Sequence, residues 1–462
     1  MFDIKKTIGL FDNLYYTEVK GYKAIWNPYS YKSPFVFPEK LFAPLKKILN
    51  GKYSIDEVQK RIEKTDLLEK KEIPLLIQQL QDHNLLSYDK EKNHIHINPQ
   101  SNSEKASFWI DVTNQCNFRC TYCYIDRKKE VIDPHKLRLL LEGLLKQKKD
   151  YPFRKMLFIL AGGEPLLYFD ALKKTIKVLQ EFQKNHKGEM TSDIQIITNG
   201  SLLTEERAKY FKKEKVRLSI SFDGIGAYND KTRQFANGSG TYSKVTKGID
   251  IAKNYDILAN TITTVTSKNI KHLPELVSSL LEREVGFQLQ FYKKVTKFCL
   301  DEPVVFNDES IGYYLKAVKN VYDWYASGHK KKKDMDIYLD SVKIPFYTGE
   351  HGCAAGYNYF TITQNCEIKV CPASEVKIPF ESAPRYISAV RNRHKEFVGH
   401  SVNHNPVCKK CLWKYQCKGG CKMEQFVTGS TKKAPSTCLF YKKYIPYLIN
   451  LEVESILRSN GV

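Results

Sequence analysis

Residues 107–124 read SFWIDVTNQCNFRCTYCY and join a strand to a cysteine-rich loop. Phe108–Val112 is mostly apolar and bulky, which is typical of a buried strand. Cys116, Cys120 and Cys123 follow soon after this strand, at spacings of four and three residues. In parallel α/β folds, active sites form at the C-terminal ends of the strands. The segment therefore predicts an α/β fold with a cysteine site beyond its first strand.

The alternation of apolar strands with amphipathic helices continues downstream, which is typical of a parallel sheet. Six strands are expected: Phe108–Val112, Leu157–Leu160, Ile194–Thr198, Arg217–Ser221, Asn260–Val265 and Phe287–Phe291. A complete barrel of this kind has eight strand–helix units. Six units predict an open, partial (β/α)6 TIM-type barrel.

The three thiols of the loop suit an iron–sulfur cluster. Four-iron clusters are normally held by four cysteines, so three would leave one iron open to a small molecule. A structural zinc site is the alternative, but it needs four ligands, commonly from paired cysteine or Cys/His elements. The loop contains no histidine. We therefore interpret Cys116, Cys120 and Cys123 as ligands of an iron–sulfur cluster.

The octet CNFRCTYC at residues 116–123 resembles the CxxxCxΦC signature of the radical S-adenosylmethionine (SAM) superfamily, with Tyr122 at the aromatic position. The resemblance extends over residues ~105–295. After the second expected strand, residues 162–165 read GGEP, like the family motif that meets the methionine amino group. Two glycines let a backbone approach a ligand closely.

Two later segments support the same resemblance. Asn199 and Gly200 follow the third expected strand, and residues 219–224 read SISFDG at the end of the fourth. Both resemble the family's ribose and carboxylate contacts. The stretch from Asp223 to Arg233 resembles the family's DG…HDxxR pattern, although Asn229 replaces the usual histidine. The resemblance implies a set of SAM-contacting residues: Tyr122, Gly162, Gly163, Glu164, Asn199, Ser219, Ser221, Asp223 and Arg233.

The resemblance also implies a mechanism. SAM chelates the open iron through its amine and carboxylate, and an electron donor such as a flavodoxin or ferredoxin supplies one electron. The sulfonium is then cleaved, and the 5′-deoxyadenosyl radical abstracts a hydrogen from the substrate. The cofactor supplies this chemistry, whereas the barrel positions it and excludes water.

A second group of cysteines occupies the last quarter of the chain and resembles the SPASM extension of peptide-modifying radical SAM enzymes. That extension carries two auxiliary four-iron clusters, which with the first would make three. The resemblance implies one cluster on Cys408, Cys411, Cys417 and Cys438. It implies a second, inner cluster on Cys353, Cys371 and Cys421. Zinc binding is again the alternative.

Two departures from the SPASM pattern affect the expected chemistry. Cys366 stands where the family has a glycine. Either Cys366 is the fourth ligand and closes the inner cluster, or the inner cluster has an open iron that can bind a substrate thiolate. The upstream fourth ligand of some members is also absent, since the nearest earlier cysteine is Cys299. Pro372 follows Cys371, where the sulfatase-maturing branch has an acidic residue that serves as a base. This counts against sulfatase maturation.

The first hundred residues predict a small winged-helix-like module. Its expected elements are strands at Leu14–Val19 and Lys23–Trp26, a helix ending at Asn50-Gly51, a helix opened by a Ser54–Glu57 capping box, a helix from Glu72, and a returning wing strand at His94–Ile97. The order resembles the PqqD-like domains that bind leader peptides as an added strand. The alternative is a module that only packs on the barrel.

The net charge of +22 raises the question of a nucleic-acid partner. The basic residues are spread along the chain, and the densest run, Lys330–Lys333, is short. We therefore expect a solvated surface or an acidic peptide partner rather than nucleic acid. The sequence shows no signal-like segment and no stretch of ~20 apolar residues, so we expect a cytoplasmic protein without a membrane partner.

We predict five regions: a leader-recognition module (1–100), a radical SAM partial barrel (105–298), a helical bridge (299–350), a SPASM domain (351–442) and a C-terminal helix (443–462). The resemblance implies a peptide maturase, an oxidoreductase that abstracts a hydrogen from a ribosomally made precursor peptide and installs a crosslink. A thioether is favoured over a carbon–carbon or ether link. Side-chain oxidation of the sulfatase-maturase type is the alternative. A zinc-rich nucleic-acid-binding protein is the alternative from another class.

Overall fold

The computed structural model describes most of the chain, with gaps. The described residues are 7–88, 92, 104–146, 153–296, 301–328, 338–339, 349, 353–375, 377–379, 387–390, 392 and 401–462. The expected wing strand at His94–Ile97, the run Lys330–Lys333 and Cys299 lie outside them.

The core of the molecule is an open ten-stranded sheet in the order β13-β12-β11-β10-β9-β8-β7-β14-β15-β16. The six strands predicted from the sequence are all present and parallel: β7 (Lys105–Thr113), β8 (Lys155–Gly162), β9 (Thr191–Thr198), β10 (Arg217–Ser221), β11 (Leu258–Val265) and β12 (Phe287–Phe291). The α/β fold with a central parallel sheet is therefore confirmed.

The sheet continues beyond the six expected strands. β14 (Tyr359–Ile362) pairs in parallel with β7, and β13 (Tyr338–Leu339) pairs in parallel with β12. β15 (Ile368–Lys369) and β16 (Lys377–Ile378) then add antiparallel strands. The region from 351 onward thus begins as part of the barrel's own sheet.

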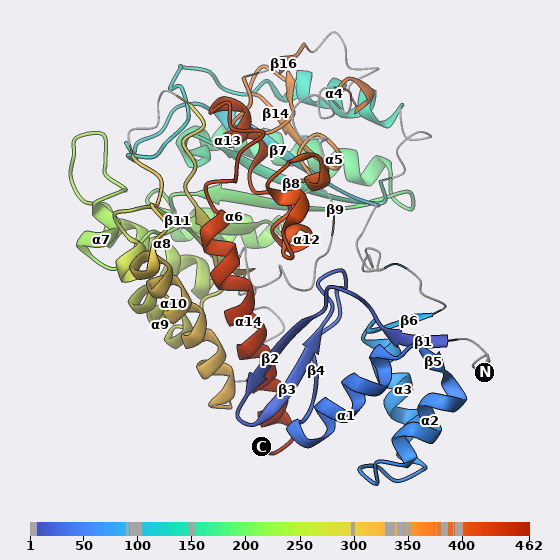
Figure 1. Cartoon of the computed structure of the whole chain (residues 1–462). Helices are drawn as coiled ribbons and strands as arrows, with labels where there is room; N and C mark the ends of the chain where they lie inside the picture. The colour runs from blue at the N-terminus through green and yellow to red at the C-terminus, as the bar shows by residue number, and fades with distance from the viewer. Residues whose placement is uncertain are drawn as a thin grey trace.

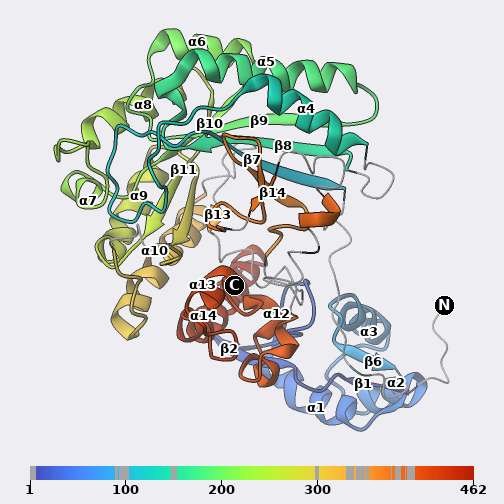
Figure 2. The ribbon, with the colours of Figure 1, turned by 90° about the horizontal axis from the view of Figure 1, so that it is seen from above.

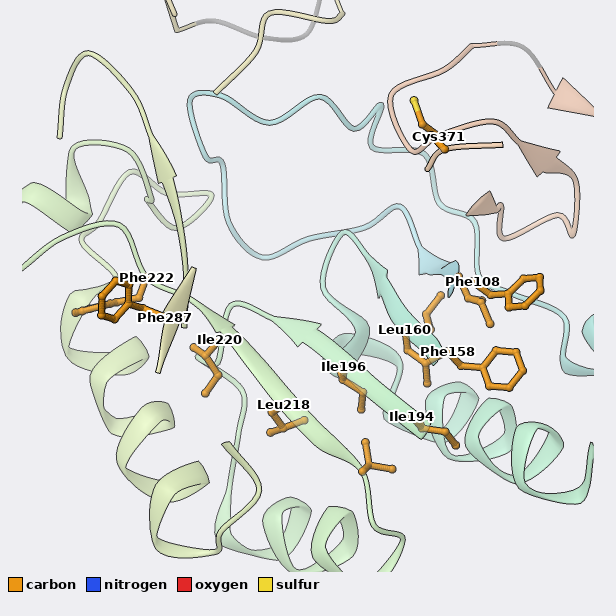
Figure 3. Close-up of a cluster of buried hydrophobic side chains, with 14 of the residues drawn as sticks. Phe108, Phe158, Leu160, Ile194, Ile196, Leu218, Ile220, Phe222, Phe287 and Cys371 are labelled. Carbon is orange, nitrogen blue, oxygen red and sulfur yellow. The ribbon is translucent and has the colours of Figure 1, made fainter. Parts of the chain in front are cut away.

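Helices cover the outer face of the sheet (Figures 1 and 2). They are α4 (Pro134–Leu145), α5 (Phe169–Asn185), α6 (Glu205–Lys213), the short α7 (Ala227–Asp230), α8 (Tyr242–Asn254) and α9 (Leu273–Glu282). Side chains alternate between the two faces of a strand. Phe108, Phe158, Ile196 and Ile220 point toward the helices and form the core, while Cys371 lies on the other side of the sheet (Figure 3).

Two long helices connect the barrel with the C-terminal region. α10 (Asp308–Ala326) packs against α9 and against α14 (Cys438–Ser459). Phe440 of α14 contacts the rings of Phe291 and Tyr314, so the last helix is anchored in the main core. α14 begins at Cys438, so the C-terminal helix starts before the predicted boundary at 443.

The front module has its own apolar core and two three-stranded sheets. One sheet contains β1 (Thr7–Leu10), β5 (Tyr53–Ser54) and β6 (Leu86–Tyr88), and the other contains β2 (Tyr15–Val19), β3 (Tyr22–Trp26) and β4 (Phe35–Pro38). Three helices complete it: α1 (Glu39–Asn50), α2 (Ile55–Glu63) and α3 (Glu72–Asp82). The Ser54–Glu57 capping box is confirmed at the start of α2.

The front module packs on the C-terminal region through its β2-β3-β4 sheet. Trp26 stacks on Trp413 with ring centroids 6.1 Å apart, and Thr17 donates a hydrogen bond to Asn450 of α14. The Gln416 side chain, in the short helix α12 (Lys414–Cys417), donates to the Pro28 carbonyl. A further short helix, α13 (Lys422–Val427), follows Cys421. These contacts explain why β2 and α14 lie side by side in Figure 1.

Candidate active site between two groups of cysteines

A cavity of about 500 Å³ lies on the inner side of the sheet, and we call it the main cavity. It is lined by side chains at alternating strand positions, including Trp109 on β7, Ile197 on β9 and Thr264 on β11. Neighbouring positions such as Phe108 and Ile196 are buried under the helices. The period-two pattern of the strands therefore separates a core face from a cavity face.

Cys116, Cys120 and Cys123 all line the main cavity, as the sequence predicted for a site beyond the first strand. Two backbone hydrogen bonds fix their loop: Arg119 N–H donates to Gln234 O (2.7 Å), and Thr121 N–H donates to Thr232 O (3.0 Å). Burial raises the pKa of the Cys116 thiol to about 12 and that of the Cys120 thiol to about 11. Both thiols must lose their protons when they bind a metal.

The GGEP loop packs so tightly on the cysteine loop that only glycine fits. A Cβ at Gly162 would overlap the Thr113 carbonyl oxygen, and one at Gly163 would overlap that of Gln115. Gly162 also has φ +122°, which side chains strongly disfavour. The two loops are joined by Gly163 N–H to Thr113 O (2.6 Å) and Glu164 N–H to Gln115 O (2.8 Å).

Glu164 is fully buried and connects three segments at the floor of the site. Its carboxylate accepts hydrogen bonds from Leu166 N–H (2.9 Å), Thr198 Oγ1 (2.7 Å) and Asn199 N–H (2.7 Å). Burial raises its pKa, against the lowering effect of these bonds. Asn199, placed in this way, donates from Nδ2 to Asn117 on the cysteine loop (2.9 Å).

Asp223 is a second buried carboxylate with several hydrogen-bond partners, and one of them is Tyr122, the aromatic residue of the cysteine motif. It accepts from Tyr122 OH (2.6 Å), Arg233 Nε (3.0 Å) and Thr232 Oγ1 (3.0 Å), and from Thr264 N–H (3.0 Å). Burial disfavours the charged guanidinium of Arg233, but Asp223, Tyr122 and Cys120 together outweigh this effect, so the pKa of Arg233 is raised. Arg233 therefore brings a permanent positive charge to the cavity wall.

The structure divides the expected SAM contacts into two sets. Six line the main cavity: Tyr122, Gly162, Gly163, Asn199, Ser221 and Arg233. Glu164, Ser219 and Asp223 lie outside its lining, and their side chains bond to protein groups. Ser219, for example, donates to Asn260 and accepts from Gln195 Nε2 (2.5 Å).

Cys353, Cys371 and Cys421 line the same main cavity as the front cysteines. Burial raises the pKa of the Cys371 thiol to about 11. Pro372 and Ala373 also line this part of the wall. The two groups of cysteines, distant in sequence, therefore face one cavity.

The four cysteines expected to hold the outer cluster surround a separate cavity of about 530 Å³, which we call the outer cavity. They are Cys408, Cys411, Cys417 and Cys438. Burial raises the pKa of the Cys417 thiol to about 12. The Cys438 thiol is supplied by the first residue of α14, so this site joins the last helix to the cysteine-rich loops.

Cys366 lines neither cavity. It is fully buried, and its thiol donates to the Asp133 carbonyl at the start of α4 (3.9 Å). In the described residues, no group of three or more His, Cys, Asp or Glu side chains is arranged to hold a single metal ion. Each cysteine of a four-iron cluster binds a different iron, so cluster ligands need not converge on one point.

Sequence reasoning missed several residues near the cavity. Tyr124, Arg127 and Tyr359 line the main cavity. Asp111 lines an adjoining pocket of about 260 Å³, which we call the polar annex. Asp111 had a visible signal, because a carboxylate inside an otherwise apolar strand is unusual.

Residues 110–280 match the profile of the radical SAM superfamily. This part of the chain is a radical SAM domain. The family implies bound SAM and a four-iron cluster, and the donor set fits both: three thiols share a cavity with two glycines that a Cβ would block. The prediction made from CNFRCTYC is confirmed at the level of the domain.

Several relatives share most of the chain. A cysteine-type anaerobic sulfatase-maturating enzyme of Clostridium novyi is 27% identical over 331 residues, which are 67% of this chain and 86% of that protein. The structure of native anSMEcpe with bound AdoMet has a TM-score of 0.60 at 21% identity, covering 75% of this chain and 99% of that one.

A second solved structure extends the likeness over more of the chain. Streptococcus suis SuiB bound to the precursor peptide SuiA has a TM-score of 0.54 at 15% identity. It covers 93% of this chain and 99% of that one. Separately, none of the described helices has the length and apolarity needed to cross a bilayer.

Proposed function

We propose that this radical SAM enzyme modifies a residue of a peptide in the main cavity. The observation that carries the proposal is that Cys116, Cys120 and Cys123 line the same cavity as Cys353, Cys371 and Cys421. A substrate residue in this space lies next to both groups of thiols. The radical SAM domain also accounts for the front cysteines, which the zinc alternative would assign to a structural metal.

The front cysteines would hold the cluster that binds SAM. When bound, these groups supply a 5′-deoxyadenosyl radical, and the protein's part is to orient SAM and exclude water. Gly162 and Gly163 would let the backbone approach the methionine moiety. Asn199, Ser221 and Arg233 would contact the rest of the molecule, with the guanidinium placed for a carboxylate. Glu164 and Asp223 would keep these contacts in position.

The C-terminal cysteines would hold two auxiliary clusters. Cys408, Cys411, Cys417 and Cys438 form a complete set of four around the outer cavity. Cys353, Cys371 and Cys421 form a set of three, and the position of Cys366 beside Asp133 argues against its being the fourth ligand. An open iron at the inner site would accept a substrate thiolate, which supports a thioether product.

Peptide crosslinking and side-chain oxidation remain the two candidate reactions. The matched sulfatase-maturating enzymes favour oxidation, while Pro372 removes the acidic residue expected in that branch. The broader likeness to a structure with a bound precursor peptide favours a maturase. The front module would then bind a leader segment as an added strand. We favour crosslinking because of Pro372 and because of the likeness to the structure with a bound precursor peptide.

The test uses the purified chain reconstituted anaerobically with iron and sulfide. With dithionite and SAM it should form 5′-deoxyadenosine, and replacing Cys116, Cys120 and Cys123 by alanine should abolish this. A candidate precursor peptide, sought in small reading frames beside this gene, should lose two hydrogens. Tandem mass spectrometry then separates the reactions, because a crosslink suppresses fragmentation between two residues and an oxidised side chain does not. An unchanged peptide mass during continued SAM cleavage would refute the proposal.

A further inference from the structure

We propose that Asp111 is the catalytic base that removes the S–H or O–H proton of the substrate residue in the main cavity. This inference rests on the proposed function, and it assigns a residue to the proton transfer that the reaction requires. Pro372, which follows Cys371 on the cavity wall, has no group that accepts a proton, so a base must be another residue.

The first support is the position of Asp111 on β7. Trp109 lines the main cavity, and Asp111 is two residues further along the same strand, so both side chains lie on the inner face of the sheet. Asp111 pairs with Ala161 of β8, and Ala161 also lines the cavity. The carboxylate therefore lies on the side of the sheet where the cysteines are.

The second support is the polar annex, which contains Asp111 and adjoins the main cavity. Five residues line both spaces: Asn114, Tyr124, Ile125, Pro372 and Ala373. A substrate side chain near Cys371 would reach the carboxylate by entering the polar annex between these shared residues. Asp111 is only partly buried, so proton exchange with the annex is open to it.

The third support is the hydrogen bonding of the carboxylate. Oδ1 accepts from Trp109 Nε1 (2.8 Å), which fixes the plane of the group. Oδ2 receives no hydrogen bond from the described residues, unlike both oxygens of Glu164 and Asp223. Asp111 is thus oriented but keeps an oxygen free to accept a proton.

The charged and titratable groups around Asp111 suit a base at neutral pH. Tyr124 and Tyr359 lie on the cavity side, and Lys369 and Lys377 approach from β15 and β16. The other charged residues that line the polar annex are Asp126, Lys128, Glu130 and Glu375. Lys369 donates to the Pro372 carbonyl (2.7 Å), and Lys377 pairs with Glu367 (2.8 Å), so both have other partners. Burial, which outweighs these lysines, raises the pKa of Asp111 to about 6.

The step balances as follows. A substrate C–H bond breaks, and its hydrogen atom passes to the 5′-deoxyadenosyl radical to give 5′-deoxyadenosine. The S–H or O–H proton passes to Oδ2 of Asp111, and the heteroatom's electron pair forms a new bond to the carbon radical. One electron is left over, and an iron–sulfur cluster that Cys353, Cys371 and Cys421 would hold would be the oxidant that takes it. The same step serves a thioether crosslink and a side-chain oxidation.

The test compares Asp111→Asn with the wild-type enzyme, using a uniformly deuterated precursor peptide that the wild-type enzyme modifies. Asparagine can still accept the Trp109 hydrogen bond but cannot take a proton. We expect 5′-deoxyadenosine formation and deuterium transfer to stay within about threefold of wild type. Product per 5′-deoxyadenosine should fall by about 100-fold or more, the usual effect of losing a general base. Asp111→Glu should restore part of it.

The pH profile of the wild-type enzyme gives a second, independent measurement. The carboxylate accepts a proton only when it is ionised, so product per 5′-deoxyadenosine should fall as the pH drops below about 6. A ratio that is constant from pH 5 to 8 would overturn the proposal. The proposal would also be overturned if the Asp111→Asn enzyme kept the wild-type ratio of product to 5′-deoxyadenosine. The same holds if this variant lost 5′-deoxyadenosine formation to the same extent as product. Failure of the proposed function is distinct, because the wild-type enzyme itself would then leave the peptide unchanged.

Discussion

At the scale of single residues, Gly163 controls the distance between the two loops that form the candidate SAM site. A Cβ there would overlap the Gln115 carbonyl oxygen and approach Asn114 C to 2.9 Å. Gly163→Ala must therefore push the loops apart. Displacements of about 1 Å cost about 100-fold in well-positioned reactions, so we expect 5′-deoxyadenosine formation to fall by at least that factor, measured by chromatography with dithionite and SAM.

The matched control is Gly312→Ala in α10. Nothing lies within 4 Å of a Cβ at this position, and alanine favours the helix by roughly 0.5–1 kcal/mol. This variant should keep wild-type activity and iron content. Equal activity losses in both variants would contradict the assignment of Gly163 to the site.

The buried pair of Asp223 and Arg233 gives a stability prediction. Their side chains are 0% and 8% exposed, so Asp223→Ala would leave the guanidinium buried without its partner. Removal of one member of a buried pair costs about 3–5 kcal/mol. Urea denaturation should show a loss of that order, whereas Asp323→Ala, at the exposed pair with Lys319 in α10, should cost less than about 1 kcal/mol. Similar losses in the two variants would contradict the role given to Asp223.

At the scale of elements, sequence reasoning predicted the barrel strands well because each has its own local signal. Arg217–Ser221 and Phe287–Phe291 have the predicted bounds, since each is a short segment of alternating polar and apolar residues between helices. The motifs did not separate cavity-lining residues from supporting ones. Ser219 and Ser221 share one face of β10, but only Ser221 lines the cavity, because Asn260 and Gln195 bond to Ser219. Such long-range partners have no local signal.

The same limit applies to Cys366 and to β14. The chain places Cys366 beside Asp133 and β14 beside β7, and both contacts join segments more than 200 residues apart. From cysteine spacing alone, Cys366 was a possible fourth ligand of the inner cluster. Only the tertiary contact with the start of α4 separates it from the inner group of cysteines.

The contact between the β2-β3-β4 sheet and the C-terminal region gives a prediction for these elements. Trp26 is buried against Trp413 and packs in one apolar cluster with Ile445 and Ile449 of α14. Trp26→Ala should cost about 3–5 kcal/mol at this contact. Hydrogen exchange should then quicken in β2, β3 and β4, while 5′-deoxyadenosine formation without peptide stays near wild type. Leu75→Ala, at a side chain that is 59% exposed, should change neither readout.

At the scale of the whole molecule, the two cavities and the cysteines around them predict a stepwise iron content. If each group holds a four-iron cluster, the reconstituted chain carries three clusters, and replacing one group by alanine removes about four iron atoms. Loss of the front group should abolish SAM cleavage. A different second effect is expected when the outer group is replaced. Besides the loss of iron, α14 should become less stable, because Cys438 is its first residue. The outer group is Cys408, Cys411, Cys417 and Cys438.

Cys366→Ala tests whether the inner cluster has three cysteine ligands or has Cys366 as a fourth. The thiol lies beside the Asp133 carbonyl and lines neither cavity, so iron content and the visible spectrum should be unchanged. Some stability should be lost, because the side chain is fully buried in the main core. Cys371→Ala is the matched substitution at a buried cysteine that does line the main cavity, and it should remove about four iron atoms. Equal iron losses in the two variants would make Cys366 a ligand and would close the inner site to a substrate thiolate, which removes the physical reason for favouring a thioether.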